Sequence, residues 1–133
     1  MSTLFVDANI PMYLVGAPHP NRDRAVILLE QAIGAGDRLV TDAEVMQEIL
    51  HRYLAIGRPD AIDACLGTLR GVIDEVYAVT GDDVLTARAL LTAVSALSAR
   101  DAVHAAVMHR HGARRILSFD TGFDRVGGLQ RVY

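Results

Sequence analysis

The sequence predicts an α/β fold: a three-layer α/β/α sandwich with a central parallel sheet. Short apolar runs alternate along the chain with longer segments whose apolar residues recur at helical spacing. The first run, Leu4-Phe5-Val6, is continuously apolar, which is typical of a parallel strand that is covered on both faces. Glycines, prolines and capping residues separate the segments at short intervals, without a linker, repeat or low-complexity stretch. Residues 1–133 are therefore expected to form a single domain.

Helix starts are indicated by capping-box patterns, in which Ser or Thr is followed three residues later by an acid. Three such pairs precede apolar helical patterns: Thr41 with Glu44, Thr80 with Asp83, and Ser98 with Asp101. The expected elements, in chain order, are strand 4–6, helix 10–15, helix 22–33, strand 38–40, helix 41–56, helix 59–70, strand 72–79, helix 80–97, helix 99–111, strand 116–119 and strand 129–133.

The composition is that of an ordered globular protein. Hydrophobic residues make up 51% of the chain and charged residues 22%. No apolar run approaches the ~18 residues needed to cross a bilayer, and the N-terminus lacks the pattern of a signal peptide. We therefore expect a cytoplasmic protein without a membrane partner. The single cysteine, Cys65, excludes an internal disulfide and a cysteine-rich metal site, and it lies in an apolar helical pattern typical of a core.

The charged residues exclude several functions. The net charge of −3 argues against a protein that coats nucleic acid by bulk attraction. All 13 basic residues are arginine, so chemistry that requires lysine, such as Schiff-base formation or P-loop phosphate binding, is excluded. Arginine still suits bidentate contacts with phosphate, so local recognition of a phosphate or nucleic acid remains open.

Four acids stand out by their positions. Asp7 and Asp120 each follow an apolar strand, and in parallel α/β sheets the chemistry gathers beyond the carboxyl ends of the strands. Asp101 begins a helix whose inner residues are small enough for close approach to the sheet. Glu48 lies in mid-helix beside an apolar stripe, closer to it than Glu44. We expect these carboxylates to meet at one edge of the sheet.

Each of these acids also has an ordinary structural explanation. Asp7, or the nearby Asn9, could cap the following helix. Asp101 could be only the carboxylate of its capping box, and Glu48 could be a solvated helix residue. Asp120 could simply begin the turn formed with the next two residues. Only the convergence of the four acids would favour the functional interpretation.

Converging carboxylates repel one another, so either their pKa values rise or a cation neutralises them. Oxygen ligands without a cysteine cluster favour a hard cation, Mg²⁺ or Mn²⁺. Such a site can activate water and stabilise charge that develops on a phosphoryl group. His104, three residues after Asp101, is expected to pack against a neighbour or face solvent and not to bind the metal. The other histidines are not expected to be ligands either: His19, His51, His109 and His111.

The chain resembles the PIN-domain family, and in length and organisation it is similar to the VapC toxins of bacterial toxin–antitoxin pairs. Four segments in order carry the resemblance: Phe5-Val6-Asp7-Ala8-Asn9, Val45-Met46-Gln47-Glu48-Ile49, Arg100-Asp101-Ala102-Val103-His104-Ala105-Ala106 and Ser118-Phe119-Asp120-Thr121-Gly122-Phe123. Together they span almost the whole chain, from Leu4 to Val132.

The resemblance implies a Mg²⁺- or Mn²⁺-dependent endoribonuclease that cuts RNA, often tRNA or ribosomal RNA. Its catalytic and metal-binding acids would be Asp7, Glu48, Asp101 and Asp120. The polar residues that support them would be Asn9 and Ser118, with Asp124 as an additional acid. The family also implies a homodimer that is held inactive by a small VapB-like antitoxin, for which the apolar helices between Val45 and Leu69 are the candidate surface.

There are three alternatives to a PIN-domain nuclease. A haloacid-dehalogenase-like phosphatase would need an aspartate where this chain has Asn9, and usually a downstream lysine. A response-regulator receiver would need adjacent acids after the first strand and a lysine after the last ones; neither is present. The third alternative is a catalytically idle PIN-like module that only binds RNA or protein, against which the intact set of acids argues.

Overall fold

A computed structural model describes residues 2–133 of the chain. Within this range, five strands form one sheet in which every neighbouring pair is parallel, in the order β3-β2-β1-β4-β5. Their bounds are β1 Thr3–Val6, β2 Arg38–Asp42, β3 Glu75–Tyr77, β4 Arg115–Leu117 and β5 Gln130–Val132. The predicted α/β class and the parallel sheet are confirmed.

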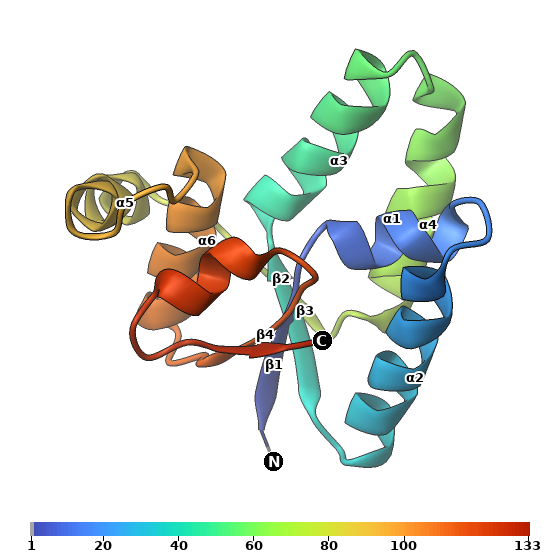
Figure 1. Ribbon diagram of the computed structural model, residues 1–133, viewed down its shortest axis with the longest axis horizontal. Helices are drawn as coiled ribbons and strands as arrows, with labels where there is room; N and C mark the ends of the chain where they lie inside the picture. Colours follow the sequence, from blue (N-terminus) through green and yellow to red (C-terminus); the bar gives the residue numbers. More distant parts are fainter. Residues whose placement is uncertain (1) are drawn as a thin grey trace.

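Helices cover both faces of the sheet. Figure 1 shows α5 and α6 on one side and α1, α2 and α4 on the other, while α3 continues from the carboxyl end of β2. None of the helices in residues 2–133 has the length and apolar character needed to span a membrane. The helix bounds are α1 Asn9–Val15, α2 Pro20–Gly34, α3 Ala43–Ala55, α4 Ile62–Val72, α5 Gly81–Ala93 and α6 Ala99–Arg110, with short 3-10 helices η1 Pro59–Ala61 and η2 Thr121–Arg125.

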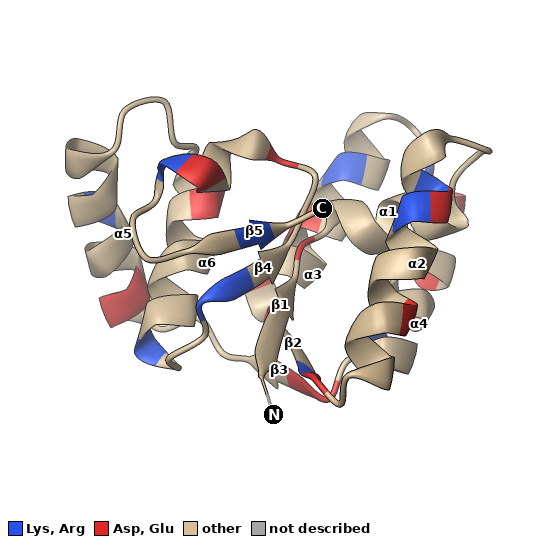
Figure 2. Ribbon diagram, turned by 60° about the horizontal axis from the view of Figure 1, so that its bottom comes forward, with Lys and Arg blue, Asp and Glu red and all other residues tan. Residues whose placement is uncertain are grey.

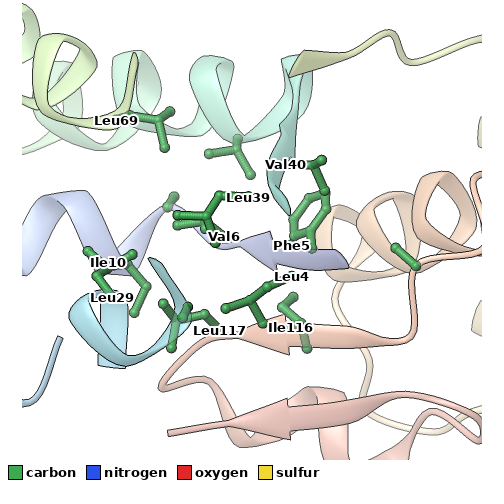
Figure 3. Packing of buried hydrophobic residues seen from close by; sticks show 14 of the residues in the cluster. Leu4, Phe5, Val6, Ile10, Leu29, Leu39, Val40, Leu69, Ile116 and Leu117 are labelled. Atoms are coloured by element: carbon green, nitrogen blue, oxygen red, sulfur yellow. The ribbon is translucent and has the colours of Figure 1, made fainter. Parts of the chain in front are cut away.

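The central strand β1 explains why the chain begins with a continuous apolar run. Phe5 and Val6 are fully buried, because helices cover both faces of this strand. Figure 3 shows their side chains among those of the neighbouring strands β2 and β4 and of the helices. Burying side chains on both faces of β1 stabilises the point from which the carboxyl-end loops extend.

Several predicted boundaries differ from those in the structure. The capping box at Thr41 does not form, because Thr41 belongs to β2 and its hydroxyl donates to the Val6 carbonyl over 2.9 Å. Asp42 caps α3 instead, its Oδ1 accepting from the Val45 amide at 2.8 Å. The predicted strand 72–79 shortens to the exposed edge strand β3, since α4 continues to Val72.

The helix predicted to reach residue 97 ends four residues earlier. α5 stops at Ala93, because Val94 has an extended backbone and Ala96 a positive φ of 60°. Leu97 is nevertheless buried, in the cluster between α5 and α6. Apolar spacing therefore identified a residue that packs inward, but it could not distinguish a last helical turn from a loop that folds back.

Candidate active site

The predicted acids meet beyond the carboxyl ends of the strands. β1 and β4 are neighbours, with Val6 paired to Leu117, so that Asp7 and Asp120 follow adjacent strands. In Figure 2 the acidic residues, in red, are spread over most helices, and some lie in the loops that follow the strands. The pocket there, of about 470 Å³, is lined by all four predicted acids together with part of α1, the loop before α2 and α3: Asp7, Asn9, Met12, Tyr13, Gly16, Ala17, Pro18, His19, Glu48, Arg52, Tyr53, Asp101 and Asp120.

Asp7 is buried and fixed by three neighbours. Its Oδ1 accepts from the Ala8 amide at 2.8 Å, and its Oδ2 accepts from the Ser118 hydroxyl at 2.6 Å. The Asn9 amide group donates to Asp7 Oδ2 over 3.4 Å and to Ser118 Oγ over 3.2 Å. Burial raises the pKa of Asp7, although the charge of His104 and the bond from Ser118 oppose the rise.

The alternative in which Asp7 or Asn9 caps α1 is wrong. The N-cap position is Ala8, and no side chain caps this helix. Asn9 and Ser118 instead form hydrogen bonds with the Asp7 carboxylate. Asp7, which could have been a helix cap by its sequence pattern, thus directs its carboxylate into the pocket.

Asp101 enters the pocket from the first turn of α6. Ser98 caps the helix by accepting from the Asp101 amide at 3.1 Å, but the carboxylate of Asp101 makes no return bond to Ser98 in the described chain. Burial and the neighbouring Asp120 carboxylate raise the pKa of Asp101 to about 7. The predicted capping box is only half formed, and the carboxylate faces the other acids.

Asp120 is exposed and has two roles. Its Oδ1 accepts from the Gly122 amide at 2.8 Å, so the turn interpretation is correct, and it also lines the pocket. A Cβ on Gly122 would lie 3.1 Å from Asp120 Oδ1 and 3.5 Å from Asp101 Oδ2. The absence of a side chain at Gly122 therefore leaves room for the two carboxylates.

His104 lies within the acid cluster, which the sequence interpretation missed. Its ring is fully buried, with Nδ1 bonded to Asp42 Oδ2 at 2.8 Å. Its Nε2 lies 3.9 Å from Asp7 Oδ1 and 3.7 Å from Glu48 Oε1. Burial lowers the pKa of His104, but the surrounding carboxylates, led by Asp42, outweigh it and raise the pKa to about 10. In the metal-free chain, His104 therefore offsets part of the negative charge of these acids.

Glu48 points inward from α3, as predicted, with only 12% of its side chain exposed. Arg100 lies beside it, with Nε 3.7 Å from Glu48 Oε1 and 3.6 Å from Glu44 Oε1. Glu44 is therefore not a capping carboxylate, as the sequence pattern suggested, but part of the charged rim around Glu48.

Donor atoms suited to a divalent cation converge at three residues. Asp7, Glu48 and His104 each offer one ligand atom, and these atoms lie within 4.8 Å of one another. Glu48 Oε1 and His104 Nε2 are buried and have no hydrogen-bond partner within residues 2–133. Unpaired buried polar atoms are costly, and a cation at this point would pair with both once it has displaced the proton from His104 Nε2. The residues present thus fit a metal, with Asp101 and Asp120 farther along the same pocket.

Asp124 lies apart from the other acids. It forms an ion pair with Arg131, with 2.9 Å between Oδ1 and Nε, and its side chain is 51% exposed. Arg131 also donates to the Ser118 carbonyl over 3.3 Å, so Asp124 reaches the site only through this arginine.

Two residues of the cluster carried a detectable signal in the sequence. Asp42 follows the apolar run Leu39-Val40, just as Asp7 follows β1, and the adjacent strands bring both acids to the same edge. His104 lies about one helical turn after Asp101, on a similar side of α6. Its burial, however, depends on α3 and β2, which no local pattern on α6 can indicate.

Comparisons with known proteins agree with this fold and site. Residues 4–129 match the family described as PIN domain. The chain is 53% identical over 129 residues to ribonuclease VapC13 of Mycobacterium tuberculosis, covering 97% of this chain and 98% of that protein. Its fold is similar to the crystal structure of M. tuberculosis VapC20, a sarcin–ricin loop cleaving toxin, with a TM-score of 0.75, 23% identity, and coverage of 93% and 95%. The crystal structure of VapBC2 from Rickettsia felis, bound to a DNA fragment from its promoter, matches with a TM-score of 0.74 at 12% identity. The match covers 98% of this chain and 97% of that chain.

The parallel sheet, the acidic pocket at its carboxyl edge and the match over residues 4–129 define the class of a PIN domain. With 53% identity over nearly its full length to VapC13, the chain belongs to the PIN-domain family and, within it, to the VapC ribonucleases.

Proposed function

We propose that this protein is a metal-dependent endoribonuclease, the toxin of a type II VapBC-like toxin–antitoxin pair. It hydrolyses phosphodiester bonds of RNA, with tRNA or ribosomal RNA as the expected class of substrate, using Mg²⁺ or Mn²⁺. The observation that carries this proposal is the meeting of Asp7, Glu48, Asp101 and Asp120 in one pocket. The identity to named ribonucleases supports RNA as the substrate.

The chain's own residues would hold a cation and keep its ligands oriented. Asp7, Glu48 and His104 present the closest donor atoms, and Asp101 and Asp120 would complete the ligand set from the open side of the pocket. A bound divalent cation lowers the pKa of its water and screens the charge that develops on the phosphate. Ser118 and Asn9 keep the Asp7 carboxylate oriented during this chemistry.

Asp101 and Asp120 lie side by side at the open side of the pocket. In the metal-free chain, burial and the Asp120 carboxylate raise the pKa of Asp101 to about 7, and a bound cation would favour its charged form. No cysteine lines the pocket to act as a nucleophile.

We expect single changes of acids to abolish cleavage. The variants Asp7→Asn and Asp101→Asn keep the side-chain size but remove one negative charge from the cation site, so turnover should fall by about 100-fold or more. The measurement is cleavage of total cellular RNA by purified protein freed of antitoxin, in Mg²⁺ or Mn²⁺, with and without EDTA.

Asp63→Asn is the matched control, because Asp63 is exposed on α4 and does not line the pocket. It should cleave like the unmodified protein. Cleavage that survives EDTA, or that persists undiminished in both site variants, would refute the metal-nuclease proposal. A protein that folds and binds the metal, yet never cuts RNA, would support the alternative of an idle PIN-like module.

The proposed partners follow from the same family membership. We expect a homodimer and a cognate VapB-like antitoxin that keeps the nuclease inactive. Exposed apolar residues on α3 and at its C-cap support this expectation: Leu50 and Leu54 on the helix are 41% and 62% exposed, and Ile56 at the cap is 64% exposed.

A further inference from the structure

Besides its acids, the active-site pocket is lined by Tyr13 on α1, His19 at the N-cap of α2, and Arg52 on α3, and we call these three residues the wall of the pocket. We propose that these three side chains form a nucleotide subsite, in which Tyr13 and His19 stack on an unpaired RNA base and Arg52 contacts its phosphate. This inference rests on the proposed ribonuclease function, and it describes how the RNA substrate would be held beside the acids.

Two helices connect the acid cluster to this wall in the same way. α1 begins beyond β1 and carries Asn9, which is bonded to Asp7, and four residues later Tyr13. α3 begins beyond the adjacent strand β2 and carries Glu48, and four residues later Arg52. Side chains four residues apart lie on one helix face, about 6 Å apart along the axis. The subsite therefore lies one helical turn from the acids on both helices.

The aromatic residues are held in a defined orientation. The Tyr13 ring packs edge-on against Phe119, with centroids 5.5 Å apart and an interplanar angle of 86°. Phe119 lies between Ser118 and Asp120, and its amide donates to Asn9 Oδ1 over 3.4 Å. The contact with Phe119 thus links the ring of Tyr13 directly to the strand end that carries the catalytic residues.

His19 extends this aromatic surface to the pocket rim. Its ring lies 5.0 Å from Tyr13, tilted by 36°. Its Nδ1 accepts from the Asn21 amide at 3.0 Å, capping α2, so the ring proton resides on Nε2. His19 is exposed and Tyr13 partly exposed, which leaves ring surface on which a base can stack.

Arg52 adds an exposed positive charge to the lining of the pocket. It is exposed, and within residues 2–133 it forms no ion pair or hydrogen bond. Arg100, by contrast, lies between Glu44 and Glu48. A phosphate approaching four carboxylates is repelled, so a guanidinium that lines the same pocket without an ion-pair partner favours binding of an RNA backbone.

The test measures binding in EDTA, where cleavage cannot occur. The probes are a fluorescein-labelled single-stranded RNA of about 12 nucleotides and an abasic ribose-phosphate oligomer of the same length. The unmodified full chain, freed of antitoxin, should prefer the RNA. Tyr13→Ala should weaken RNA binding about 10-fold and leave abasic binding unchanged, whereas Tyr13→Phe should bind like the unmodified protein.

Changes of His19 and Arg52 should affect binding in different ways. His19→Asn keeps an N-cap acceptor but removes the ring, so RNA binding should weaken several-fold without loss of the fold. Arg52→Gln should weaken binding of RNA and of the abasic oligomer equally, and should reduce the slope of log affinity against log salt by about one. His51→Asn and Arg70→Gln, exposed and outside the pocket, are the matched controls.

The subsite is refuted if folded Tyr13→Ala binds RNA as tightly as the unmodified protein, or keeps the same preference over the abasic oligomer. Loss of antitoxin binding in Tyr13→Ala with unchanged RNA binding would assign the wall to a protein partner and also refute it. If Tyr13→Ala weakens RNA binding but the unmodified protein never cleaves RNA, the subsite stands and the nuclease proposal is rejected. If the unmodified protein cleaves RNA and Tyr13→Ala binds RNA normally, only the subsite is rejected.

Discussion

Asp101 illustrates how one residue's neighbours change the chemistry of a side chain. Burial and the adjacent Asp120 raise its pKa to about 7, whereas the unfolded chain would titrate it near 3.8. Between these values the folded protein binds more protons than the unfolded chain. Its stability therefore falls as the pH rises through this window, and above pH 7 the full cost of the charged carboxylate is present.

Removing this charge should stabilise the metal-free protein. We expect Asp101→Asn to raise the melting temperature near pH 8 by about 2–5 °C, and to change it little near pH 4, where Asp101 is already protonated in the folded state. Thermal unfolding in EDTA at both values measures this, with Asp63→Asn as the control. A lower melting temperature near pH 8 would mean that the Asp101 carboxylate is satisfied by bonds and not repelled.

At the scale of elements, the pair Asp83–Arg110 ties the start of α5 to the end of α6. Arg110 Nε donates to Asp83 Oδ1 at 2.8 Å, and Nη2 donates both to Oδ2 and to the Ala78 carbonyl at 2.9 Å. Asp83 also completes the capping box with Thr80, as the sequence predicted. The bond from Arg110, with those from Thr80, holds the pKa of Asp83 down to about 2.

This pairing should stabilise the protein above the ordinary pKa of aspartate. Asp83→Asn should lower the free energy of unfolding near pH 7 by about 1–2 kcal/mol, a value reduced because Arg110 is 39% exposed and screened by solvent. The difference should shrink as the pH falls from about 4 towards 2, where Asp83 takes up its proton in the folded state.

Urea unfolding across this pH range measures the effect. Asp82→Asn is the matched control, since Asp82 is the exposed neighbour in the same helical turn. An Asp83→Asn effect that is the same at every pH would show that packing, and not the charge, explains the loss.

At the scale of the whole molecule, α3 and α4 extend beyond the sheet as a pair (Figure 1). We expect the apolar residues on α3 to be covered by the antitoxin or by a second copy of the chain. Leu54→Arg should therefore lower the affinity for the antitoxin by about 100-fold, because it places a charge in an apolar contact, while RNA cleavage by the free toxin remains.

Leu85→Arg is the matched control, because Leu85 is 70% exposed on α5, on the opposite side of the sheet. Co-purification with the antitoxin encoded beside this chain, and sedimentation of the free toxin, are the measurements. A strict monomer with no such antitoxin, or equal loss in both variants, would contradict this assignment.

The sequence by itself determined the fold class and the acids that could do chemistry. The continuous apolar run of β1 requires cover on both faces, and acids directly after such runs must lie at the carboxyl edge of a parallel sheet. For that reason Asp7, Asp120 and the inward-facing Glu48 could be placed in one pocket before any coordinates. Spacing and residue type are local properties, and they are sufficient for these assignments.

Only the tertiary structure decided which of these acids cap helices and which face the pocket. A Thr or Asp near a helix start has the same local pattern in both cases, so Thr41 was mistaken for a cap and Asp42 was overlooked. The burial of His104 likewise depends on contacts from β1, β2 and α3, each distant in sequence. Electrostatic shifts come from all the charges brought within a few ångströms, and that proximity exists only once the chain is folded.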